Sequence, residues 1–131
     1  MKEPLISIKL HDSSRQYSAG GLLTGESQVD AVEPADLEAV ETSVLWYTEG
    51  KGDEDLGVHH FERVTADAAG ATLHELRQFS TRLPHSPRSY EGVLVKIRWC
   101  VRVRIFLRGG KSFLAEQPFS LEKLAIPAMA D

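Results

Sequence analysis

Five basic side chains occupy even-numbered positions of one otherwise apolar stretch, Gly92 to Arg108. They are Lys96, Arg98, Arg102, Arg104 and Arg108. In a β-strand, residues two apart point to the same face, so these charges would converge into a ridge. Guanidinium groups bind carboxylates and phosphates through paired hydrogen bonds, which favours a surface for an acidic or phosphorylated partner. The alternative is that these side chains cover the sheet and pair with Glu and Asp of neighbouring strands.

Two other groups carry metal-ligating side chains. Asp53, Glu54 and Asp55 offer carboxylates to calcium, but adjacent carboxylates lack the spacing of a calcium loop, which favours a solvated hairpin tip. His59 and His60 should point to opposite faces of a strand and so would not chelate one ion together. We expect no metal site.

Cys100 lies mid-strand among the basic residues. Basic neighbours lower the pKa of a thiol, so a reactive cysteine is one reading, and a plain sheet cysteine is the favoured alternative. The chain has no Gly-x-Ser-x-Gly nucleophile elbow, and Gly109-Gly110-Lys111 joins two strands instead of forming a phosphate loop. We expect no enzyme activity and no cofactor.

The element that must position these residues is the stretch from Gly92 to Arg108 itself. Its odd positions are apolar from Val93 to Leu107, and a two-residue period predicts a strand with one buried face. Its 17 residues would span about 55 Å, so we expect it to bend, bulge or pass from one packing neighbour to the next. Trp99 and Trp46 have the parity of core residues and should be packing anchors.

Further strands are expected on either side of this one. The predicted ranges are 5–10, 22–29, 37–48, 58–65, a broken strand over 72–83, and 111–121. A loop or single helical turn should fill 31–39, a glycine turn should lie at Gly109-Gly110, and Pro118 should mark a bulge or an edge. About seven to eight antiparallel strands with almost no helix predict an all-β, immunoglobulin-like β-sandwich. We expect one domain over 1–124 and a C-terminal tail over 125–131.

Bulk properties narrow the class of protein. The 131 residues are 42% hydrophobic and 26% charged, as in soluble globular domains, and no apolar run approaches the roughly 18 residues of a membrane span. A single cysteine favours a reducing, cytoplasmic setting. Residues 1–60 carry 4 basic and 12 acidic residues, whereas residues 61–131 carry 11 basic and 7 acidic residues. The chain as a whole is not basic, which disfavours general nucleic-acid binding.

Two passages resemble the amino-terminal lobe of arrestin-family proteins. Tyr17 to Gly25 is similar to the family's aromatic, Pro-Gly, Gly opening, with Ala19 in place of the proline. The second passage runs from Phe79 to Val103. It reads Phe79-x-x-x-Leu83-Pro84, then Pro87-x-Ser89-Tyr90-x-Gly92, then Ile97-x-Trp99-x-Val101-x-Val103, with Trp99 where the family has tyrosine. The resemblance covers about residues 5–123, and the family's members have two such lobes, of which this chain matches one.

The resemblance implies an arrestin-type sandwich acting as a non-catalytic adaptor or scaffold. Its strand edges, loops or basic face would bind a protein or peptide partner, and an acidic one would suit the ridge. The same edges could build a homodimer that supplies a second lobe. The alternative function is a small-ligand or carbohydrate-binding module, for which Tyr47, Tyr90 and Phe106 are the candidate aromatics.

Overall fold

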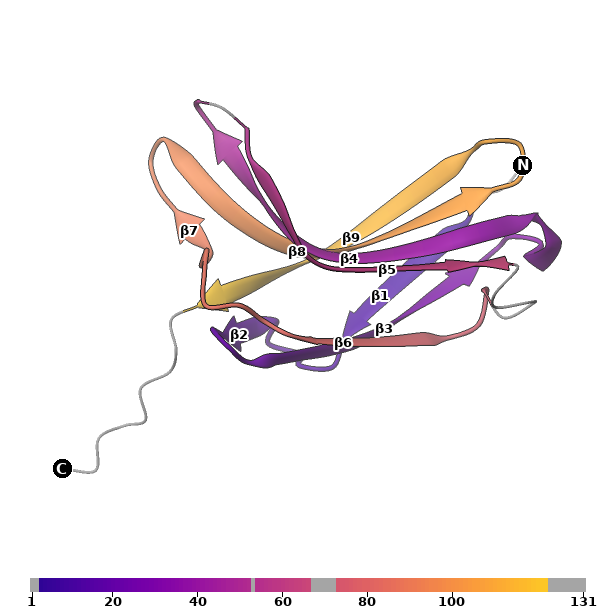
Figure 1. The fold of residues 1–131 in the computed structure, drawn as a ribbon, viewed down its shortest axis with the longest axis horizontal. Helices are drawn as coiled ribbons and strands as arrows, with labels where there is room; N and C mark the ends of the chain where they lie inside the picture. The colour runs from indigo at the N-terminus through magenta and orange to yellow at the C-terminus, as the bar shows by residue number, and fades with distance from the viewer. Residues whose placement is uncertain (1–2, 53, 67–72, 123–131) are drawn as a thin grey trace.

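Two β-sheets pack face to face in the computed structural model, which describes residues 3–52, 54–66 and 73–122 (Figure 1). Within these ranges, one sheet has the order β1-β3-β6, and the other has the order β2-β9-β8-β4-β5, with β7 also paired to β8. The strands are β1 (Leu5–Leu10), β2 (Gln16–Ser18), β3 (Leu22–Asp30), β4 (Leu37–Gly50), β5 (Leu56–Thr65), β6 (Arg77–Arg82), β7 (Tyr90–Glu91), β8 (Val95–Leu107) and β9 (Ser112–Glu122). One 3-10 turn, η1 (Pro34–Asp36), precedes β4. The predicted all-β sandwich is confirmed.

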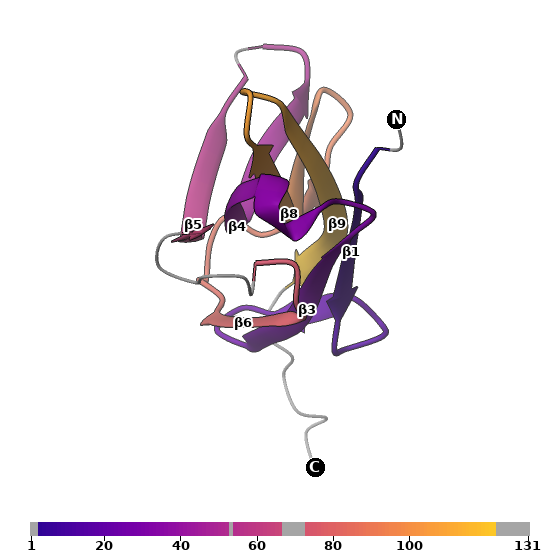
Figure 2. The same ribbon diagram turned by 90° about the vertical axis from the view of Figure 1, so that its right-hand side faces the viewer.

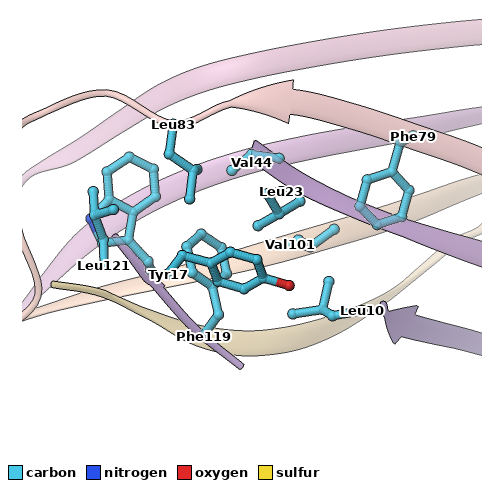
Figure 3. Close-up of a cluster of buried hydrophobic side chains, with 10 residues drawn as sticks. Leu10, Tyr17, Leu23, Val44, Phe79, Leu83, Val101, Phe119 and Leu121 are labelled. Atoms are coloured by element: carbon cyan, nitrogen blue, oxygen red, sulfur yellow. The ribbon is translucent and has the colours of Figure 1, made fainter. Parts of the chain in front are cut away.

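The predicted central strand is β8, and its apolar face lines the core. Trp99, Val101, Val103 and Ile105 are each at most 1% exposed. Trp99 and Val101 pack with Leu23 of β3 and other side chains of one cluster (Figure 3). Val103 and Ile105 belong to a second cluster. The Trp99 indole also donates a hydrogen bond of 2.8 Å to the Pro87 carbonyl, so its one polar atom is satisfied.

The length of β8 is accommodated by a change of neighbour and by curvature. Its first residues pair with β7, and Trp99 to Phe106 pair with β9, while β4 lies along its other side. Figure 1 shows β4 and β8 bending so that both ends rise away from the three-stranded sheet. The face of the six-stranded sheet turned away from the core, here called the outer face, is therefore concave.

The predicted start of the long strand is wrong. β8 begins at Val95, and Val93 is fully exposed in a turn, where Gly92 donates a backbone hydrogen bond of 3.0 Å to the Val95 carbonyl. Before this turn, Tyr90 and Glu91 form the short strand β7, which pairs antiparallel with the start of β8. The alternation of apolar and polar residues extends in the sequence beyond the strand into the turn before it. Because Val93 lies in that turn, it is not on the buried face of β8.

Two other elements differ from prediction. β6 begins at Arg77 instead of residue 72, and Leu73 reaches the core from a turn, being 3% exposed. β2 was not predicted; it has three residues and pairs in parallel with β9. Three residues carry no readable alternation, so its sequence gave no signal.

The turns fall where they were expected. Gly109 and Gly110 have φ of 93° and 92° in the β8–β9 hairpin, a conformation that glycine adopts without strain. Pro118 pairs with Cys100 on one side, while β2 reaches β9 only at Ser120–Glu122, so Pro118 lies on an edge stretch as predicted. The expected tail over 125–131 lies outside the described residues, as do four residues of the turn expected at 66–70; the boundary at residue 124 stays a prediction.

Candidate functional site

The outer face of the six-stranded sheet holds most of the predicted site residues. The ladder registers place side chains of β9, β8, β4 and β5 in rows across it. From one end to the other the rows are Arg98-Tyr47-Leu56, then Pro118-Cys100-Leu45-Val58, then Glu116-Arg102-Ser43-Phe61, then Leu114-Arg104-Glu41-Arg63, then Ser112-Phe106-Ala39-Thr65. Arg98, Arg102 and Arg104 do share this face, as the two-residue period requires.

Acidic neighbours pair with the basic residues at the start of β8. Arg98 donates to Glu49 at 2.9 Å and to Glu91 at 2.5 Å, and the Lys96 ammonium lies 3.7 Å from Glu91. The pKa of the Arg98 guanidinium is raised, above all by the hydrogen bond to Glu49. Both cations therefore lie in a local charge-neutral group.

Arg102, Arg104 and Arg108 have three different surroundings. Arg102 pairs with Glu116 across the β8–β9 ladder at 2.6 Å. Arg104 makes no ion pair or hydrogen bond with another residue that the structure describes, although it stands in register with Glu41, whose carboxylate pairs with Arg63. Arg108 lies beyond the end of β8, where its Nε donates to the Ala35 carbonyl at 2.7 Å. The five basic residues thus do not form one continuous ridge of unpaired charge.

Cys100 lies on the same face but is buried. It is 1% exposed, and burial raises the pKa of its thiol to about 12. At neutral pH the thiol is protonated, which removes the nucleophilic form. The structure favours the plain sheet cysteine over the reactive one.

The histidine pair does not lie on opposite faces of β5, so that prediction is wrong. A β-bulge falls between the positions opposite Val44 and Leu45, and His59 is the extra residue. His59 contacts the Trp99 ring edge-on and lies 2.7 Å from the Arg82 carbonyl, so it reaches from β5 toward the smaller sheet. His60 stands in register with Val44, a core residue. Among the described residues no three His, Cys, Asp or Glu side chains gather as a metal site, and Asp53 lies outside that set.

Sequence reasoning missed an apolar patch along β5. Leu56, Val58 and Phe61, here called the β5 patch, are exposed by 50%, 54% and 53%. They lie on the outer face, which no second sheet covers among the described residues, and β5 is the last strand of its sheet. A signal was present: the apolar positions change from even numbers to the odd number 61, and such a parity switch marks a bulge.

The patch continues inward across the sheet. Val58 stands in register with Leu45, Leu45 with Cys100, and Cys100 with Pro118, which makes an apolar row across four strands. A cavity of about 680 Å³ adjoins the row at the β4–β5 hairpin, where Tyr47, Leu56 and Arg102 line it. Leu45 and Cys100 are buried, so the apolar side chains that this region exposes are those of the β5 patch.

The aromatics proposed for carbohydrate binding do not form a platform. Tyr47 and Phe106 share the outer face, but Tyr47 is paired with Arg98, eight residues before Phe106, a separation of about 26 Å along the strand. Tyr90 pairs with Ile97, whose parity is that of the core face. The Arg63 guanidinium lies 5.0 Å from the centre of the Phe106 ring. These three aromatic residues therefore give no support to the carbohydrate-binding alternative.

Comparison with known proteins relates this chain to others through its fold alone. No protein-family model matches the sequence, and no curated protein matches it. None of the described residues forms a helix long and apolar enough to cross a membrane. Among solved structures, the sporulation control protein Spo0M from Bacillus subtilis is similar with a TM-score of 0.63 at 13% identity. The match covers 93% of this chain and 50% of that chain, so this chain spans about half the length of Spo0M. The fold is arrestin-like.

Proposed function

We propose that the protein is a non-catalytic adaptor of arrestin-like type that binds an extended peptide segment of a protein partner along β5. The observation that carries this proposal is the β5 patch, which lies on an open strand edge. The arrestin-like fold it shares with Spo0M is compatible with a binding role.

An open edge supplies two kinds of contact to an added strand. Within the part of the chain that the structure describes, β5 pairs with β4 alone, so its other side offers backbone donors and acceptors. A peptide that adds as a strand gains affinity from these hydrogen bonds and specificity from pockets for alternate side chains. The exposed side chains of the β5 patch would contact the peptide's apolar side chains.

β5 also carries features that limit uncontrolled pairing. The bulge at His59 interrupts its regular edge, and Glu62 and Arg63 place charges on its second half. Bulges and charges are common devices against edge-to-edge aggregation. Regular pairing would therefore be confined to a short segment around Leu56 to Val58.

Three expectations from the sequence stay proposals. A second copy of the chain could occupy the same edge, and light scattering would then give twice the monomer mass. An acidic partner would find Arg104 available, since it has no carboxylate partner among the described residues. A cytoplasmic location follows from cysteine usage alone.

The test is a comparison of bound proteins captured from native cells. Val58→Lys places a charge in the β5 patch at an exposed site and should remove the partners that bind the edge. Leu114→Lys makes the same change on β9 of the same face, where Leu114 is 48% exposed, and should keep them. Partners retained by Val58→Lys, or lost equally by both variants, would contradict the proposal.

A further inference from the structure

A second candidate site lies at the end of the sandwich that carries the start of β1, η1 and the β8–β9 hairpin (Figure 2). A cavity of about 880 Å³ opens there, within the size range of ligand sites. None of its lining residues belongs to β5 or to the outer-face rows, so this end groove is separate from the proposed adaptor edge.

The floor of the end groove is apolar and fixed by the core. Pro4, Val32, Leu107 and Phe113 line it. The last three are partly buried and pack against the second core cluster, so the surface is preformed. The connection from β3 turns here at Ala31, whose φ of 61° is a strained conformation for a residue with a side chain.

The rim of the end groove carries an excess of carboxylates. Glu3, Glu33 and Asp36 line it together with one cation, Lys111, three negative charges against one positive. None of these four forms an ion pair with another described residue. The nearby Arg108 is engaged, because its backbone N–H and its Nε donate to the carbonyls of Asp36 and Ala35, and these bonds hold η1 against the hairpin.

We infer that the end groove binds an extended basic peptide that places apolar side chains on the floor and lysine or arginine side chains against the rim carboxylates. The carboxylates come from separate segments, since Glu3 precedes β1, while Glu33 comes directly before η1 and Asp36 is its last residue. The ligand therefore needs several cations around an apolar centre. A peptide with alternating basic and apolar residues supplies them, because lysine side chains are long enough to lie along an apolar surface and carry their ammonium groups to its rim. The end groove would therefore bind a basic partner, whereas the basic side chains of β8 suggest an acidic one.

Fluorescence polarisation with three labelled heptapeptides tests the inference on the full chain. The probe KLKLKLK should bind saturably, and ELELELE and KSKSKSK should bind at least tenfold more weakly. Combining Glu33→Gln with Asp36→Asn should weaken KLKLKLK binding about three- to tenfold, the range for two exposed ion pairs. Lys111→Gln removes the repelling cation and should strengthen binding about twofold.

Matched controls separate the end groove from general charge effects and from β5. Combining Glu54→Gln with Glu75→Gln makes the same change in net charge at exposed carboxylates that do not line the end groove, and should leave the affinity unchanged. Val58→Lys should also leave it unchanged. The inference is overturned if KLKLKLK does not saturate, if ELELELE binds equally well, or if the control pair weakens binding as much as the groove pair.

Discussion

At the residue scale, ion pairs decide how much of the basic strand is available to a partner. Arg98 and Arg102 hold carboxylates of neighbouring strands, which is the arrangement expected when long side chains cover a sheet. Arg104 is the exception on this face among the described residues. A role in binding an acidic partner therefore rests on Arg104 more than on its neighbours.

Paired and unpaired arginines should differ in their effect on stability. Arg102→Ala breaks a partly exposed ion pair with Glu116 and should lower the free energy of unfolding by about 0.5–1 kcal/mol. Arg104→Ala should change it by less than about 0.5 kcal/mol. Urea denaturation measures both, and equal losses would mean that Arg104 has a partner of similar strength.

The buried thiol of Cys100 predicts a dependence of stability on alkaline pH. Its pKa is raised to about 12 in the folded protein from an ordinary value of 9.0, so the folded state holds the proton more tightly. This contribution is fully present below pH 9.0 and is lost as pH rises from there toward 12, at up to about 1.4 kcal/mol per pH unit.

Cys100→Ala is the matched variant for this prediction. Between pH 8 and 10, urea denaturation of the wild type should show a falling free energy of unfolding, and the variant should show a smaller fall. Iodoacetamide should label the wild type only after unfolding. Rapid labelling of the folded chain at pH 8 would show that the thiol is accessible and ionised.

At the element scale, the boundary of β8 separates residues that look alike in the sequence. Val93 and Val101 have the same parity and the same side chain, yet one is fully exposed and the other is fully buried. The hydrogen bond from Gly92 to the Val95 carbonyl makes the difference, because it closes the turn before the strand begins.

Alanine substitutions at these two valines test the boundary. Val101→Ala removes two buried methyl groups and leaves a cavity, so we expect a loss of about 2 kcal/mol in the free energy of unfolding. Val93→Ala should change it by less than about 0.5 kcal/mol. A large loss for Val93→Ala would place the start of the buried strand before Val95.

At the scale of the whole molecule, the six-stranded sheet has a stable centre and a weaker edge. β8 lies between β4 and β9, and β4 lies between β8 and β5, whereas β5 has one neighbouring strand among the described residues. Its edge position and half-exposed side chains predict that β5 opens more easily than the central strands β4 and β8.

Amide hydrogen exchange should follow this order. The amides of β4 and β8 that face a neighbouring strand should exchange most slowly, and those of β5 should exchange at least tenfold faster under native conditions. Mass spectrometry of peptic fragments measures this difference. Equal protection of β5 and β8 would indicate that another chain covers the β5 edge in solution.

The alternation of side chains by itself determined the fold class and the centre of the core. Residues 95–107 could only bury Trp99, Val101, Val103 and Ile105 together if they formed a strand, and the glycine turns and further alternating segments then indicated a sandwich or a barrel, of which the sandwich was favoured. The arrestin-like resemblance drawn from Phe79 to Val103 agrees with the fold that the structure shares with Spo0M.

Only the tertiary structure decided which of these elements are covered. Alternation reports faces within one strand, but the partners of Arg98 and Arg102 come from residues up to 49 positions away. The exposure of the β5 patch depends on which face of the sheet the smaller sheet covers. The end groove likewise joins residues from both ends of the described chain. Contacts between distant segments fix charge pairing, open edges and cavities, and a one-dimensional period carries no information about them.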